Sequence, residues 1–155
     1  MCLTFFKILV RPLFIGKSVS SNNLTCEVMA FSTRFQALPL RKTMSLGDAT
    51  RATVDLDFGG TDCAQPMLWA AEKKKEFDVF VVYTDCETYA SHVHPCEALR
   101  RYRAQSGIKD AKLIVVGMSS NGFTIADPAD PYMLDVVGFD SAAPRVMADF
   151  AAGLI

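Results

Sequence analysis

Two short segments of the chain carry oxygen-bearing side chains where a strand and a helix should meet. Thr61 follows Gly59 and Gly60, whose backbone can turn freely. Asp85 follows an apolar run, residues 77–83, that predicts a buried parallel strand. Ligands of open α/β sheets bind outside the carboxyl ends of the strands. A hydroxyl and a carboxylate brought there are hard oxygen ligands, which suit Mg²⁺ or a similar cation.

The same residues also have structural interpretations. Residues 63–75 predict a helix, and Thr61 or Asp62 could cap its free amides. Asp85 could cap the turn that follows its strand. These roles compete with metal binding.

Composition predicts a single soluble globular domain. The chain has 155 residues, of which 50% are hydrophobic and 21% charged. The net charge of −1 argues against a dominant nucleic-acid surface. The 5 cysteines are odd in number and lack the spacing of a disulfide scaffold, so we expect reduced thiols and a cytoplasmic location.

The first 16 residues are strongly apolar but interrupted by Lys7, Arg11 and Pro12. The uninterrupted runs are too short for a membrane span. A secretory signal would place its charges ahead of an unbroken apolar centre, so a signal or transit peptide is the weaker interpretation. We expect a strand from Leu3 to Val10, within a divergent N-terminal segment of residues 1–24.

The rest of the chain predicts strands that alternate with helices, which is typical of a parallel α/β sheet. Residues 77–83 and 112–117 are apolar without alternation, so we expect them to be adjacent central strands. Residues 33–46 and 119–131 are predicted to be loops. The other expected strands are 25–32 and 135–139, and the expected helices are 48–56, 63–75, 95–105 and 142–152.

Boundary signals support two of these helices. Pro95 opens one helix and Gly107 ends it, while Ser141 is expected to cap the last helix. Leu99 and Tyr102 lie about one turn apart and should face the core.

Four further groups could carry chemistry, but a structural role is favoured for each. The cysteines and histidines of residues 86–96 suggest zinc, yet their spacing matches no known ligand pattern. Cys63 near a helix start could be a reactive thiol, but a catalytic cysteine needs a positioned histidine base. Two basic clusters, Lys73-Lys74-Lys75 and Arg100-Arg101-Arg103, are expected to be solvated helix faces and are too small to indicate RNA binding.

From Cys26 to Ile155 the chain resembles the C-terminal von Willebrand factor type A domain of the Ro ribonucleoprotein autoantigen family. The resemblance rests on four segments: GGTDCAQPMLWA, DVFVVYTDCETYASHVHPCEALRRYR, AKLIVVGMSSNGFTIADP and MLDVVGFD. Members of this family contain a ring of helical repeats, which binds small noncoding and misfolded RNAs. The A-type domain closes the ring. The resemblance therefore implies a Rossmann-like α/β fold over residues 25–155, with a mostly parallel sheet flanked by helices.

The resemblance also implies a metal-ion-dependent adhesion site at the top of the sheet. Thr61 matches its middle threonine and Asp85 its last aspartate. The first element of that site, Asp-x-Ser-x-Ser after the central first strand, is absent from this sequence. The residues after Leu3–Val10 are Arg11-Pro12-Leu13, which offer no oxygen ligands. The RNA-binding helical repeats are absent too, so the sequence is interpreted as a truncated or divergent member that lacks the family's first strand.

These features predict a non-enzymatic, partner-binding module of a Ro-like RNA-binding ribonucleoprotein. Its protein partner would bind at the upper edge of the sheet. A residual site at Thr61 and Asp85 would bind Mg²⁺ or Mn²⁺ weakly, and small noncoding RNA would be contacted indirectly or not at all. The alternatives are a small α/β hydrolase or phosphotransfer enzyme using Asp85, and a fragment without function. The chain has no G-x-S-x-G, P-loop or G-x-G-x-x-G motif, which argues against the enzyme.

Overall fold

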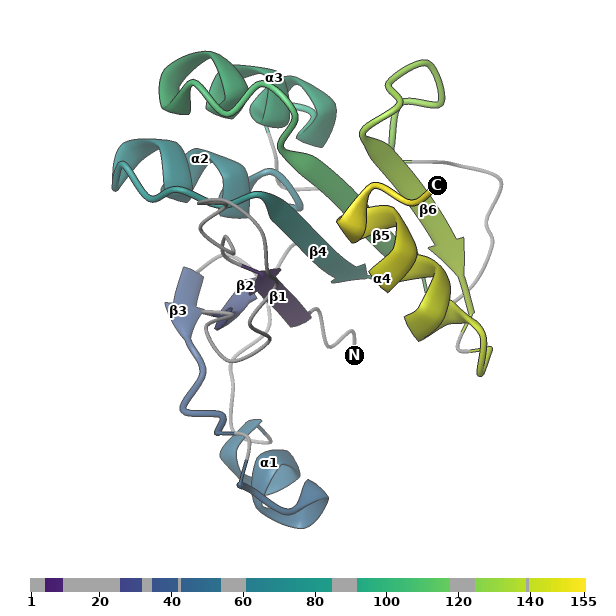
Figure 1. The fold of residues 1–155 in the computed structure, drawn as a ribbon. Helices are drawn as coiled ribbons and strands as arrows, with labels where there is room; N and C mark the ends of the chain where they lie inside the picture. Colours follow the sequence, from purple (N-terminus) through teal and green to yellow (C-terminus); the bar gives the residue numbers. More distant parts are fainter. Residues whose placement is uncertain are drawn as a thin grey trace, which may run out of the picture.

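The structure, a computed structural model, describes residues 5–9, 26–31, 35–41, 43–53, 61–84, 92–117, 125–138 and 140–155. The strands are β1 (Phe5–Leu9), β2 (Cys26–Phe31), β3 (Phe35–Ala37), β4 (Val79–Thr84), β5 (Lys112–Gly117) and β6 (Met133–Val137). The helices are α1 (Leu46–Thr53), α2 (Gln65–Glu72), α3 (Pro95–Ser106) and α4 (Ala143–Ala152). Figure 1 shows α1 set apart from the sheet, whereas α2, α3 and α4 pack against the sheet.

The strands form one sheet in the order β3-β2-β1-β4-β5-β6. Strand β4 runs parallel to β5, with Val79 opposite Lys112 and Thr84 opposite Gly117. Strand β6 extends the parallel part on the other side of β5. The prediction that the two continuously apolar runs are adjacent parallel strands is confirmed. Such runs fit these positions because both faces of a parallel sheet are covered.

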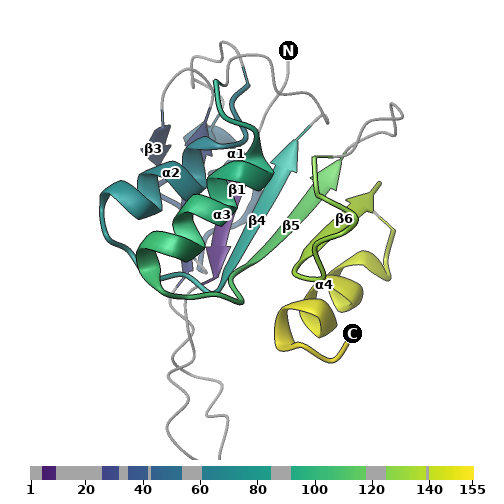
Figure 2. The same cartoon turned by 90° about the horizontal axis from the view of Figure 1, so that it is seen from above.

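Strand β1 confirms the expected extended segment near the N-terminus, and its direction is informative. It lies between β2 and β4 and is antiparallel to both. Phe5 pairs with Tyr83 and Leu9 with Val79, so β1 ends where β4 begins. Figure 2 shows β1 pointing opposite to β4, β5 and β6. Strands β2, β4, β5 and β6 therefore share one direction, and β1 and β3 run the other way.

Helices cover both faces of the sheet. Helices α2 and α3 lie side by side on one face (Figures 1 and 2), over a core that includes Phe77, Phe80 and Leu113. Helix α4 lies on the opposite face, where Phe150 packs against the alternate residues of β4 and β5. This arrangement bears out the predicted α/β class. None of the described helices is long and apolar enough to cross a membrane.

Helix α3 begins and ends at the predicted signals. Pro95 is its first residue, and Gly107 ends it with a left-handed φ of 77°. Leu99 and Tyr102 are fully buried, as expected. Arg103 differs from its prediction as an outward residue. Its side chain is only 13% exposed because it reaches an acidic partner in the β5–β6 connection.

Helix α2 is shorter than predicted at both ends. Cys63 and Ala64 form a turn before it, and the helix begins at Gln65. At its other end, Lys73 donates its backbone N–H to the helix, and the positive φ of 52° at Lys74 stops further helical bonding.

Other boundaries also differ from the sequence predictions, and α1 begins at Leu46, two residues before its expected start. Strand β3 lies within the predicted loop 33–46, where three residues of Phe-Gln-Ala carry little periodic signal. Strand β6 starts two residues earlier than expected. Ser141 does not cap α4: the residue before the helix, Ala142, has no side-chain cap, and Asp140 accepts a 2.7 Å hydrogen bond from the Ala142 N–H.

Candidate functional site

The carboxyl end of β4 lies beside the turn that precedes α2. Thr84, the last residue of β4, is fully buried although its side chain is polar. The Cys63 Sγ lies 3.7 Å from the Thr84 Oγ1, at hydrogen-bonding distance for sulfur. Cys63 follows Thr61 by two residues and Thr84 immediately precedes Asp85. The contact therefore joins the two segments that carry the predicted cation ligands.

Asp62 shapes the turn between Thr61 and α2. Its Oδ1 accepts a 2.9 Å hydrogen bond from the Ala64 N–H, and its carbonyl accepts one of 3.3 Å from the Gln65 N–H. Of the two residues predicted as possible caps, Asp62 thus satisfies amides at the helix entry. Thr61 is half-buried immediately before this turn.

Asp85 lies outside the described residues, so its pairing with Thr61 stays a prediction. Among the described residues, no three His, Cys, Asp or Glu side chains gather as a metal site. The hydroxyl of Thr61 and the carboxylate of Asp85 have the right chemistry for a hard cation. Two protein oxygens are few for an ion that takes about six, so water would have to supply the rest.

The reversed direction of β1 bears directly on this site. If β1 ran parallel to β4, the chain would leave the sheet beside Thr84. Here it leaves β1 after Leu9, which is opposite Val79 at the other end of β4. The end of β1 therefore lies at the opposite edge of the sheet from Thr84. Arg11, Pro12 and Leu13 lie outside the described residues, and their side chains offer no oxygen ligands.

Thr84 is a residue of this site that was not predicted as a ligand from the sequence. The signal that could have found it is a lone hydroxyl residue closing the otherwise apolar strand VFVVYT. A buried hydroxyl needs hydrogen-bonding partners, which makes such a residue an organiser of the adjoining loops.

The residues of the predicted Cys/His cluster have structural contacts. The Nδ1 of His94 accepts a 3.3 Å hydrogen bond from the Cys96 N–H and so caps α3. The Cys96 thiol donates to the Ile125 carbonyl at 3.0 Å. Burial, followed by the charge of Asp127, raises the pKa of this thiol, which keeps it protonated. These contacts support the structural interpretation over zinc; Cys86 lies outside the described residues.

Cys63 is fully buried and its thiol packs within the site rather than facing solvent. A nucleophile must reach its substrate, so this burial favours a structural role over the reactive-thiol interpretation.

The basic clusters largely face acidic neighbours. Arg100 contacts Asp127 at 2.6 Å and Arg101 contacts Glu97 at 3.0 Å. On α2 and its extension, Lys73 contacts Glu72 and Lys75 contacts Glu27, both at 2.8 Å. Ion pairing reduces the positive charge available to phosphates. These four exposed side chains, unlike Arg103, agree with the prediction of solvated faces.

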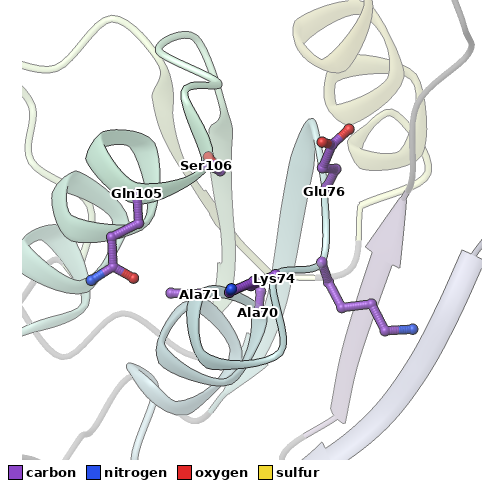
Figure 3. Close-up of a pocket in the computed structure, with 7 residues that line it drawn as sticks. Ala70, Ala71, Lys74, Glu76, Gln105 and Ser106 are labelled. Carbon is purple, nitrogen blue, oxygen red and sulfur yellow. The ribbon is translucent and has the colours of Figure 1, made fainter.

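A groove lies between the C-terminal ends of α2 and α3, away from the predicted ligands. Figure 3 shows Glu76 and Gln105 on opposite sides of it. Its lining consists of Ala70, Ala71, Lys74, Lys75, Glu76, Gln105 and Ser106. Glu76 precedes β4, so the groove lies near the amino end of that strand, whereas Thr84 marks its carboxyl end.

Comparison with known proteins agrees with this architecture. The family model described as the Ro60 vWA domain matches residues 17–151. RNA-binding protein RO60 of Caenorhabditis elegans is 45% identical over 134 residues, which cover 86% of this chain. RNA-binding protein RO60 of Deinococcus radiodurans is 50% identical over 125 residues, or 81% of this chain. The crystal structure of the Deinococcus radiodurans RO (RSR) protein superposes with a TM-score of 0.73 at 47% identity and covers 82% of this chain.

The matches extend over only part of each relative. They cover 21% of the Caenorhabditis elegans protein and 23% of the Deinococcus radiodurans protein. They cover 25% of the solved Deinococcus radiodurans chain. Family model, sequence identity and fold agree over most of the present chain. The chain belongs to the Ro60 vWA domain family.

Proposed function

We propose that this chain is a non-enzymatic, partner-binding module of a Ro-like RNA-binding ribonucleoprotein. The observation that carries the proposal is the contact between Cys63 and Thr84 in a chain of this family. It supports a binding surface at the carboxyl edge of the sheet, where the segments bearing Thr61 and Asp85 adjoin. A protein partner would bind at this edge.

A divalent cation, Mg²⁺ or Mn²⁺, would be held weakly by Thr61 and Asp85. The cation would supply an open coordination position that a carboxylate of the partner could fill. The protein's part is to orient the hydroxyl and carboxylate through the Asp62 turn and the end of β4. With few protein ligands, the affinity for the ion should be low and should rise when the partner adds its own oxygen.

RNA would be bound indirectly or not at all by this chain alone. The relatives are named RNA-binding proteins, but the matched region is about a quarter of their length or less. The paired basic side chains of α3 and of the segment after α2, together with the net charge of −1, support a minor electrostatic role. The same relatives' names support a binding rather than a catalytic function.

Titration calorimetry with Mn²⁺ and Mg²⁺ tests the cation site. We expect weak binding by the native chain and none by Asp85→Ala or Thr61→Ala. Asp110→Ala is the matched control, because Asp110 is an exposed carboxylate beside the start of β5, at the amino edge of the sheet. Tight binding that survives Asp85→Ala would place the ligands elsewhere and refute the assignment.

Fluorescence anisotropy with a labelled small noncoding RNA tests the RNA part. We expect weak binding that is lost as salt rises and is unchanged by Asp85→Ala. Submicromolar, salt-resistant binding by the isolated chain would show that it reads RNA directly.

A further inference from the structure

Strand β1 fills a central position in the sheet with a segment outside the family match. The match to the Ro60 vWA domain model begins at residue 17, whereas β1 spans Phe5–Leu9. Strands β2 to β6 all lie within the matched residues. The matched part of the chain therefore forms a sheet with room for one strand between β2 and β4, and β1 occupies that room.

The two strands that flank this position define which kind of segment can bind there. On one side, β4 presents four successive buried residues, from Val79 to Val82. On the other side, β2 ends in three buried residues, from Met29 to Phe31. Without an occupant, both strands would expose a row of backbone donors and acceptors between apolar surfaces. An extended, continuously apolar segment of about five residues would pair with these backbone groups and would suit the apolar surfaces.

The sequence of β1 is an imperfect match to these demands. It reads FFKIL, with Lys7 at its centre opposite Val28 and Val81. Its neighbour β4 and the next strand β5 have no charged residue in their interiors. Lysine is disfavoured in strands, whereas valine, isoleucine and phenylalanine are favoured. A wholly apolar segment should therefore pair more favourably than β1 does.

The connection between β1 and β2 is longer than a tight turn requires. Leu9 and Cys26 are register partners, so the ends to be joined lie side by side, yet residues 10–25 connect them. A hairpin needs only about two to five residues for such a turn. The connection therefore holds more residues than the turn requires.

We propose that the position between β2 and β4 is a strand-acceptor site, in which β1 is an exchangeable plug and a continuously apolar extended segment of a partner polypeptide is the ligand. The partner adds a strand by main-chain hydrogen bonds to β2 and β4. This site is separate from the proposed cation site at the carboxyl edge of the sheet. A test that refutes one of the two proposals therefore leaves the other standing.

The test uses the full chain and a fluorescein-labelled peptide, LTFFVILV with two lysines added at its N-terminus. Lys7→Pro should weaken β1, because proline lacks a backbone donor and is not tolerated in central strands. Lys7→Val should strengthen it. Because affinity scales with the fraction of open acceptor, we expect about tenfold tighter peptide binding by Lys7→Pro and about tenfold weaker binding by Lys7→Val, relative to the native chain. Lys7→Thr, which keeps the N–H, is the control for Lys7→Pro.

Circular dichroism and light scattering accompany the anisotropy measurement. If Lys7→Pro is unfolded alone, recovery of the native spectrum with one equivalent of peptide supports the proposal. Failure of the peptide to restore it overturns the proposal, as does equal binding by all variants or no binding by any. A dimer of Lys7→Pro that excludes the peptide would assign the position to a second copy of the chain instead. A peptide with proline at its centre should not bind, and Mn²⁺ binding should be the same in Lys7→Val as in the native chain.

Discussion

Arg103 and Asp130 form a nearly buried ion pair that ties the end of α3 to the turn before β6. The Arg103 Nη1 lies 2.5 Å from the Asp130 Oδ2, and the two side chains are 13% and 12% exposed. The Arg103 Nε also donates to the Ala111 carbonyl at 2.9 Å. The guanidinium is thus held between the start of β5 and the β5–β6 connection, and the ring of Tyr132 lies 5.5 Å from it.

Removing the carboxylate should destabilise the fold. Asp130→Asn leaves a poorly hydrated guanidinium without its counter-charge, and we expect a loss of about 3 kcal/mol in the free energy of unfolding. Urea titration measures it. Asp149→Asn is the control, because Asp149 pairs with the 80% exposed Arg145 and should contribute little. Equal effects of the two substitutions would contradict the structural role given to Arg103.

The same pair predicts a pH dependence. Burial opposes ionisation of Asp130, but hydrogen bonds from Arg103 and the Tyr132 N–H, with the charge of Arg103, hold its pKa below the ordinary value. A lowered native pKa gives stability that is complete above the unfolded value of about 3.9 and is lost as pH falls through the native pKa. The stability gap between the native chain and Asp130→Asn should therefore be constant from pH 7 to 5 and shrink below about pH 4. A gap that is undiminished at pH 2.5 would argue against the ionic origin.

Tyr102 should stabilise the entry to β4 through its hydroxyl. The Phe77 N–H donates to the Tyr102 Oη at 2.5 Å, and the hydroxyl lies within 3.2 Å of the Lys75 carbonyl and 3.1 Å of the Phe77 carbonyl. Burial raises the pKa of Tyr102, so the phenol stays protonated and can donate. Tyr102→Phe leaves buried backbone groups without this partner, which should cost about 1–3 kcal/mol in thermal or urea unfolding.

Tyr132→Phe is the control for that substitution, because Tyr132 is 39% exposed and its ring, not its hydroxyl, faces Arg103. It should unfold close to the native chain. If both phenylalanine variants behave alike, the Tyr102 hydroxyl has no special role.

His94 distinguishes a helix cap from a zinc ligand. If it only caps α3, His94→Ala should lower stability by about 1 kcal/mol, and His94→Asn should restore most of it because Asn also caps well. His92→Ala should have little effect, since His92 is exposed. Added Zn²⁺ should not raise the melting temperature of the native chain. A zinc-dependent increase that both alanine variants abolish would restore the metal interpretation.

The predictable parts of the fold were those with local signals. Pro95 and Gly107 bound α3 because their backbone preferences suit those two positions and few others. Residues 112–117 were predicted without error because an unbroken apolar run needs cover on both faces. Strand β3 was missed because three residues cannot show a period.

The direction of β1 was beyond the sequence for a different reason. A run such as FFKIL has the same pattern read either way, and only its partners β2 and β4 fix its direction. The candidate site was partly predictable. Thr61 was proposed from its place after two glycines, and its role as a ligand stays a prediction, whereas the role of Thr84 depends on a contact across 21 residues of sequence. Asp62, the other predicted cap, accepts a hydrogen bond from the Ala64 N–H in the turn before α2.

The central place of β1 also has a kinetic consequence. Its pairing with β4 joins residues as distant as Phe5 and Tyr83, whereas its pairing with β2 spans less of the chain. Contacts between distant residues form slowly, because the loop between them must first be closed. The β4–β5–β6 unit can assemble from nearer partners, so insertion of β1 should be the late step of folding. A newly made chain would then pass through a stage with its sheet open at the centre, when neighbouring chains could compete for the same backbone edges.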